Sequence, residues 1–301
     1  MRAIIVGSSA GQGVASVEHL PHPEPAAGQV RIKMAGAAVN PADLHALDGF
    51  APALGDGRPR GLGLDVSGVV DAVGADAHGL TAGMRVAAMT FPHAPHSAAG
   101  AAAEYVIVPA ADVAPVPDGL GLLDAATVPL NSLTADQLIT LLGPSRGRTL
   151  LVTGAAGGLG GYAVALAALA GWSVTGLARA SDADFLVRAG AKETITALEG
   201  VTGFDAVLDA ARLNGPALDA VRDQGTYAGV FPGAEPPAER GVTVVSAVVV
   251  PDGERLREML RLTAEGRLEA RRAGAVPLTE AATAYRVLRE GGSRGRWVLT
   301  P

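Results

Sequence analysis

Four of the seven residues from Gly154 to Gly160 are glycines, and they form the clearest candidate for chemistry in this chain. The apolar segment before them, Thr149–Thr153, is predicted to be a strand, and a helix of small residues is predicted from about Leu159 to Gly171. Glycine lets the backbone turn tightly and approach a pyrophosphate, and the free N–H groups at the start of a helix face that anion. The alternative is a strand–turn–helix junction that binds no nucleotide. The predicted dinucleotide-binding residues are Gly154, Ala155, Ala156, Gly157, Gly158, Leu159 and Gly160.

The end of the next predicted strand bears on the choice between NAD and NADP. An NAD enzyme usually carries Asp or Glu there, hydrogen-bonded to the ribose 2′-OH. In this chain Ala178 stands 18 residues after Gly160, and Arg179 follows it. A guanidinium can bind a 2′-phosphate through two N–H groups, so Arg179, with Ser181, is predicted to select NADPH. The alternative is a solvated surface arginine, and the nearby Asp182 and Asp184 weaken the prediction.

The glycine loop begins halfway along a chain of 301 residues, which leaves room for another domain before it. Hydrophobic residues make up 49%, but no window of 18 or more residues is free of polar groups, so no membrane span is expected. The absence of cysteine excludes disulfides, thiolate nucleophiles and cysteine-ligated zinc. The net charge of −6 and the lack of a basic run argue against a nucleic-acid partner. The first residues lack the apolar run of a secretory signal, so a cytoplasmic protein is expected.

The elements that would position the loop follow from the pattern of apolar runs. Residues 1–115 have short apolar runs separated by Pro and Gly, as in a β-rich domain, and Asp118–Leu142 is predicted to be helical. Strands and helices then alternate from Thr149 to Val230, which predicts a parallel, doubly wound sheet. Further elements are predicted at the end of the chain: a strand at Val242–Val250, helices at Asp252–Glu265 and Leu278–Glu290, and a strand at Gly295–Thr300.

Several segments resemble, in their order, the medium-chain dehydrogenase/reductase superfamily in its zinc-free quinone oxidoreductase branch. The resemblance implies an α/β chain with a GroES-like β-rich catalytic domain at 1–117 and 267–301 and a doubly wound Rossmann nucleotide-binding domain at 118–266. It also implies a homodimer, with Val242–Val250 as a possible interface strand. The matching segments are Val39–Asp43, Gly61–Val70, Ala103–Val106, Ala125–Ala135, the glycine loop, Leu278–Ala282 and Arg294–Arg296.

A zinc site is not expected. By motif, zinc-dependent relatives carry their catalytic ligands where this chain has Asn40, Gly63-Leu64-Asp65 and about Leu130, and leucine cannot bind zinc. His93 and His96 form an H-x-x-H pair in a Pro-rich segment; a substrate-side loop is the preferred interpretation, and metal binding is the alternative.

Without a Lewis acid, the chemistry that fits is hydride transfer from the nicotinamide to a quinone or an α,β-unsaturated carbonyl. The resemblance puts Asn40 and Thr134 near the nicotinamide. The alternatives are that Asn40 belongs to a turn before a proline and that Thr134 only caps or packs its helix. Many relatives have a Tyr where this chain has Phe50, which has no proton to give. His45 is therefore a candidate proton donor, with water as the alternative. Asp43 and Asp65 are expected to hold the first domain together.

Other cofactor contacts are predicted at the ends of later strands, where dinucleotides lie. Arg294 and Arg296, near the C-terminus, are further candidates for contact with the cofactor or its phosphate, and a solvated turn is the alternative. Two rival functions stay open: an enoyl reductase of a biosynthetic pathway, and a catalytically weak NADPH-binding sensor. The additional cofactor-binding candidates are Asp209, Ala210, Phe231 and Arg294.

Overall fold

The computed structural model describes residues 1–7, 14–48, 60–90 and 100–301, and the chain divides into two compact units. The first unit comprises Met1–Leu130, Pro251–Ala264 and Ala270–Pro301; the second comprises Asn131–Val250 and Glu265–Glu269. Gly49, Phe50, His93 and His96 lie outside the described residues.

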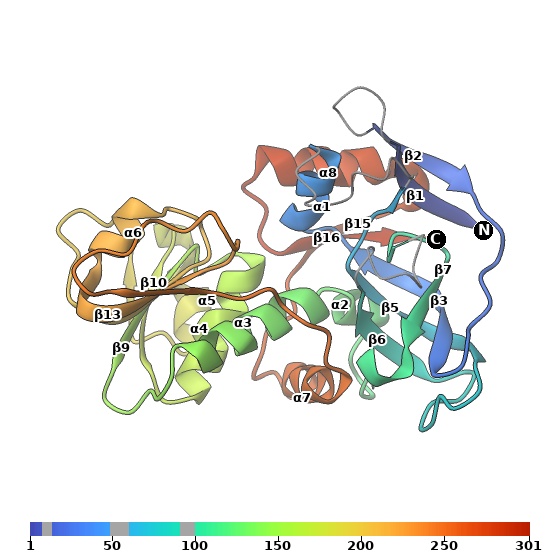
Figure 1. The fold of residues 1–301 in the computed structure, drawn as a ribbon, viewed down its shortest axis with the longest axis horizontal. Coiled ribbons are helices and arrows are strands. Elements are labelled where there is room, and N and C mark those ends of the chain that lie inside the picture. Colours follow the sequence, from blue (N-terminus) through green and yellow to red (C-terminus); the bar gives the residue numbers. More distant parts are fainter. Residues whose placement is uncertain (8–13, 49–59, 91–99) are drawn as a thin grey trace. The chain divides into compact units, whose positions relative to one another are not determined.

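The first unit is built on two β-sheets (Figure 1). The larger sheet has the order β15-β16-β3-β5-β6-β8, with β7 also paired to β3. Its strands are β3 (Gln29–Ala38), β5 (Asp65–Val73), β6 (Arg85–Met89), β7 (Tyr105–Pro109), β8 (Val113–Pro115), β15 (Arg272–Pro277) and β16 (Arg296–Thr300). The smaller sheet has the order β2-β1-β4, from β1 (Arg2–Gly7), β2 (Val14–His19) and β4 (Arg60–Gly61). The last strand of the chain, β16, pairs with β3, so the chain returns to its first unit.

Short helices accompany these sheets, and small aliphatic side chains fill the core. Helix α7 buries Leu256, Met259 and Leu260 and packs against β8, which is why it groups with the first unit. Ile4, Ile32 and many alanines and valines lie in the main core cluster, as the low aromatic content requires. The helices are α1 (Pro41–Leu47), α2 (Leu122–Ala125), α7 (Gly253–Ala264) and α8 (Ala281–Glu290), with 3-10 turns at Ala110–Asp112 and Leu278–Glu280.

The second unit contains one six-stranded, wholly parallel sheet of order β11-β10-β9-β12-β13-β14. This order is that of a doubly wound nucleotide-binding sheet, and it confirms the predicted α/β fold class. The order reverses beside β9, the strand that runs into the glycine loop. The strands are β9 (Thr149–Thr153), β10 (Ser173–Leu177), β11 (Glu193–Ile195), β12 (Phe204–Asp209), β13 (Val221–Gly229) and β14 (Thr243–Ser246). The helices are α3 (Pro129–Leu141), whose first two residues belong to the first unit, α4 (Gly158–Leu169), α5 (Ala183–Arg188) and α6 (Gly215–Asp219), with a 3-10 turn at Ala180–Asp182.

Two predicted elements differ from the structure. The helix predicted at Asp118–Leu142 is two helices, because Pro129 lacks the N–H needed mid-helix and instead opens α3. The strand predicted at Val242–Val250 ends at Ser246, because Ser246 pairs with Gly229, the last residue of β13. Among the described helices, none has the length and apolar character needed to cross a bilayer.

Candidate functional site

The glycine loop joins β9 to α4 as a turn that only glycine fits. Gly154 has a φ of +56° and its carbonyl accepts the N–H of Gly157 at 2.8 Å. A Cβ on Gly160 would overlap the Gly154 carbonyl oxygen, and one on Gly157 would lie 3.1 Å from it. The first N–H groups of α4 have no partner within the helix and open toward this loop. The loop and the start of α4 thus combine a tight turn with free backbone N–H groups, the features that a pyrophosphate site uses.

Arg179 follows β10 at the same carboxyl edge of the sheet. Its side chain is exposed, and so is Ser181. Within the described residues, the Arg179 guanidinium makes no hydrogen bond or ion pair, and Asp182 is buried rather than paired with it. Arg179 is therefore available to an anionic ligand.

Asp209 ends β12 and is fully buried. Its Oδ1 accepts a hydrogen bond from Thr153 Oγ1 at 2.5 Å, and its Oδ2 accepts from the Tyr227 hydroxyl at 2.8 Å. These contacts engage both carboxylate oxygens with the protein, and Asp209 also lines the pocket described next. Ala210, next in the chain, is half-buried.

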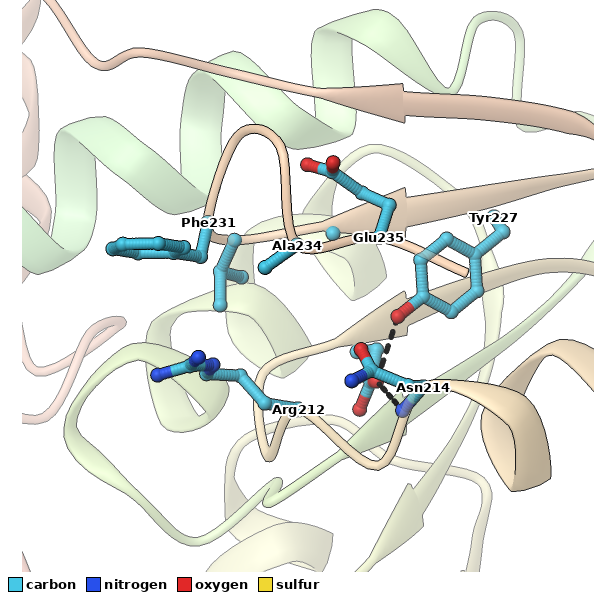
Figure 2. Close-up of a pocket in the computed structure, with 9 residues that line it drawn as sticks. Arg212, Asn214, Tyr227, Phe231, Ala234 and Glu235 are labelled. Atoms are coloured by element: carbon cyan, nitrogen blue, oxygen red, sulfur yellow. Dashed lines mark hydrogen bonds between the residues drawn. The ribbon is translucent and has the colours of Figure 1, made fainter. Parts of the chain in front are cut away.

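A small pocket lies between the segment after β12 and the segment after β13 (Figure 2). On one side the guanidinium of Arg212 lies 4.8 Å from the centre of the Phe231 ring. On the other side, Figure 2 shows the Tyr227 hydroxyl directed toward the Asn214 segment. Phe231 is thus held at the carboxyl edge of the sheet, where a dinucleotide would run.

In the first unit, Asn40 lies at the end of β3 and precedes α1, and it is fully buried. Its side-chain amide donates to Asp65 Oδ2 at 2.7 Å and to the carbonyl of Ala38 at 3.3 Å. Its Oδ1 accepts from Arg296 Nε at 3.0 Å. Both ends of the amide are therefore bound to the protein. Arg296 escaped prediction as its partner because 256 residues separate them.

Two buried carboxylates support this region through backbone hydrogen bonds, as expected from the sequence. Asp43 accepts the N–H of Asn40 at 2.8 Å and that of Gly63 at 2.9 Å, and Asp65 accepts the N–H of Leu130 at 2.6 Å. Burial raises the pKa of Asp43 to about 6, although those N–H groups act in the opposite direction. Burial also raises the pKa of Asp65 to about 7, against the N–H of Leu130 and the Asn40 amide.

Comparison with known proteins identifies the family. The description "Alcohol dehydrogenase GroES-like domain" matches residues 26–118, and "Zinc-binding dehydrogenase" matches residues 181–299. The chloroplast envelope quinone oxidoreductase homolog of Arabidopsis thaliana is 29% identical, over 98% of this chain and 97% of that protein. The 2-methylene-furan-3-one reductase of Solanum lycopersicum is 30% identical, over 91% of this chain and 72% of that protein. The chain belongs to the medium-chain dehydrogenase/reductase superfamily. Within it, the chain falls in the quinone oxidoreductase-like branch.

Other members of this superfamily are similar over the whole chain. The chloroplastic NADPH-dependent alkenal/one oxidoreductase of Arabidopsis thaliana is 28% identical, over 100% of this chain and 80% of that protein. The structure of the quinone oxidoreductase from Coxiella burnetii has a TM-score of 0.87 at 27% identity, covering 100% of this chain and 99% of the other. The mycobacterial Rv1454c structure complexed with NADPH has a TM-score of 0.83 at 26% identity, covering 100% of both chains. This dehydrogenase/reductase is therefore an oxidoreductase of the quinone reductase-like class.

The remaining predicted site residues lie in different parts of the dehydrogenase/reductase. His45 is half-buried on α1 in the first unit, and Thr134 is half-buried on α3 in the second. Arg294 is half-buried and donates to the carbonyl of Gly292 at 3.0 Å. Leu64, at the position of a zinc ligand in zinc-dependent relatives, is buried. Over the described residues, no group of three or more His, Cys, Asp or Glu side chains is placed to hold a metal ion.

Proposed function

We propose that this chain reduces a quinone or an α,β-unsaturated carbonyl with NADPH and without zinc. The glycine loop between β9 and α4 carries the proposal, because its shape fits a pyrophosphate. The chain around it has the fold of the quinone oxidoreductase-like branch. NADPH, when bound, supplies the hydride. The names of two relatives, a quinone oxidoreductase homolog and an alkenal/one oxidoreductase, support this substrate class.

The residues of this chain have distinct roles in that proposal. Gly154–Gly160 hold the pyrophosphate, with Ala210 and Phe231 along the sheet edge and Arg294 as a further contact. Asn40 and Thr134 shape the nicotinamide side. Because the Asn40 amide is hydrogen-bonded to Asp65 and Arg296, its side chain is held in place and limits the space for the nicotinamide, and it does not donate a hydrogen bond to substrate. His45 or water returns a proton to the reduced substrate.

Arg179 supports NADPH over NADH, because an exposed guanidinium without a partner among the described residues suits a 2′-phosphate. An NADPH complex of a structural neighbour points the same way. Arg179→Ala is expected to lower kcat/KM for NADPH by about 10- to 100-fold and to leave that for NADH unchanged. Arg188→Ala, at an exposed arginine on α5 that pairs with Glu269, serves as the control. An unchanged NADPH/NADH ratio in Arg179→Ala would contradict the assignment.

Zinc independence rests on the residues at the ligand positions. Leu64 has no ligand atom, and the Asn40 amide is already occupied. Dialysis against a chelator is expected to leave the rate of NADPH oxidation unchanged, whereas a loss of activity restored by Zn²⁺ would refute the proposal.

The reaction is tested by following NADPH oxidation at the nicotinamide absorbance band with a quinone panel and an enone panel. Turnover in either panel supports the proposal and identifies the substrate class. Tight NADPH binding with no turnover in either panel would reject the enzyme and favour a sensor. Failure to bind NADPH or NADH would reject the nucleotide site itself.

A further inference from the structure

Thr153 and Asp209 lie opposite each other at the carboxyl ends of two neighbouring parallel strands, β9 and β12. Both side chains are fully buried. Thr153 Oγ1 donates to Asp209 Oδ1 at 2.5 Å and accepts the backbone N–H of Ala211 at 3.0 Å. Asp209 Oδ2 accepts the backbone N–H of Asn214 at 2.8 Å. Two side chains therefore hold the segment Ala210–Asn214 at two of its backbone amides.

This segment has a backbone that needs such support. Arg212 has a φ of 58° and Asn214 a φ of 56°, the left-handed region that side chains other than glycine rarely occupy. Such conformations persist where the surroundings fix them, and they gather at ligand sites. The hydrogen bonds from Ala211 and Asn214 provide this fixation.

The held segment also lies against the glycine loop. A Cβ on Gly154 would stand 3.1 Å from the Cβ of Ala211 and 3.3 Å from its nitrogen. A shift of Ala211 would therefore alter the space at Gly154, directly after Thr153. Thr153 is joined to both segments, through the chain to Gly154 and through its hydroxyl to Ala211.

We propose that Thr153 and Asp209 form a clamp that shapes the dinucleotide site without touching the dinucleotide. They are positioning residues: they hold Ala210–Asn214 against the glycine loop before the cofactor arrives. This inference rests on the proposed nicotinamide-dependent function and assigns to Asp209 a role different from direct cofactor contact. Preorganisation of this kind raises affinity because less ordering is left to occur on binding.

Thr153→Val tests the clamp, since it removes the hydroxyl with little change in volume. We expect the Kd for NADPH, measured by fluorescence titration, to rise by roughly 10-fold. The value of kcat at saturating NADPH is expected to change by less than about 2-fold, because the reacting groups stay in place. Thr153→Ser keeps the hydroxyl and is expected to restore the wild-type Kd.

The same two strands supply a matched control at their other ends. Thr149 Oγ1 donates to Asp205 Oδ2 at 3.0 Å and accepts the N–H of Asp205 at 3.1 Å. Thr149→Val therefore removes the same kind of hydrogen bonds from β9 and β12, five residues before the glycine loop. It is expected to lower Tm less than Thr153→Val does, because Thr149 and Asp205 are only partly buried, and to leave the Kd for NADPH within about 2-fold. A wild-type Kd in Thr153→Val, or equal losses in the two valine variants, would overturn the clamp.

Amide hydrogen exchange of the wild-type protein tests the clamp even if Thr153→Val does not fold. The amides of Ala211 and Asn214 are expected to exchange slowly without NADPH, because the clamp is already formed. Rapid exchange that slows only after NADPH is added would show that the cofactor, not the clamp, orders the segment. If the wild type binds no nicotinamide cofactor, the proposed function fails, and with it the role of the clamp in binding. If the wild type binds NADPH and Thr153→Val binds it with the same Kd, only the clamp is rejected.

Discussion

Asp65 connects two parts of the first unit through a single buried carboxylate. One oxygen holds the Asn40 side chain and the other holds the N–H of Leu130 in the first turn of α3. An anion at a helix N-terminus is stabilising, because the N–H groups there carry partial positive charge. Asp43 lies near enough to raise the pKa of Asp65 further, and Arg296 lowers it. The two carboxylates and the arginine therefore form one electrostatic group.

The raised pKa values of Asp43 and Asp65 predict that stability falls as pH rises. Between about pH 4 and pH 7 the folded protein binds protons at these residues that the unfolded chain has already released. The free energy of unfolding therefore decreases with rising pH through that window, by on the order of 1 kcal/mol or more. Thermal melts from pH 5 to pH 8 should show a higher Tm at the acid end.

Asp65→Asn separates this effect from other titrations. The variant is expected to be less stable at every pH, because its amide cannot accept both N–H groups, and to show a shallower dependence of Tm on pH. Asp118→Asn, at an exposed carboxylate, is expected to keep the wild-type dependence. An equal dependence in Asp65→Asn and wild type would contradict the assignment.

At the level of elements, the first turn of α4 packs against the loop that precedes it. Gly160 tolerates no side chain, because a Cβ there would overlap the Gly154 carbonyl oxygen and crowd the Cα of Ala155. The helix can therefore begin this close to β9 only with glycine at that position. The shape of the pyrophosphate cradle thus depends on helix packing as well as on the turn.

Gly160→Ala is expected to destabilise the protein by about 1–3 kcal/mol and to weaken NADPH binding, since the backbone must move to admit the methyl group. Gly215→Ala is the control: Gly215 opens α6, has a negative φ, and has nothing within 4 Å of the added Cβ. It is expected to be neutral or stabilising by up to about 1 kcal/mol. Thermal melts and NADPH titration would decide, and an unaffected Gly160→Ala would show that the loop can relax.

The order of elements could be predicted from the sequence more fully than the contacts between them. Alternating strands and helices indicated the parallel sheet, and glycine spacing indicated the loop after β9. The contact of Thr153 with Asp209 depends on the register of β9 and β12, which neither segment encodes alone. The pairing of Arg296 with Asn40 depends on the return of β16 to β3. Side-chain contacts that depend on strand register, or on the last strand pairing with an early one, could therefore not be predicted from the sequence.

At the scale of the whole molecule, the parallel sheet of the second unit has two different edges. Its β11 edge carries the exposed residues Glu193 and Thr194, and a charge on an edge strand discourages pairing with another chain. Its β14 edge continues into a segment whose Val248 and Val250 side chains are 69% and 57% exposed. Both the N–H and the carbonyl of Val250 are bound by the Gln137 side chain, at 3.2 and 3.0 Å. This segment is thus held in place while its valines face outward.

We propose that this edge joins two copies of the chain in a homodimer, because fixed, exposed valines beside β14, the last strand of the sheet among the described residues, form an apolar surface suited to a second copy. Light scattering of the wild type is expected to give twice the mass of a single chain. The double variant Val248→Asp, Val250→Asp is expected to give the single-chain mass, since the new carboxylates would repel one another across a symmetric interface. Val187→Asp, at a 64% exposed valine on α5, should remain a dimer. If the wild type has the mass of one chain, the homodimer proposal is wrong. If the double variant is still a dimer, the interface lies on another surface.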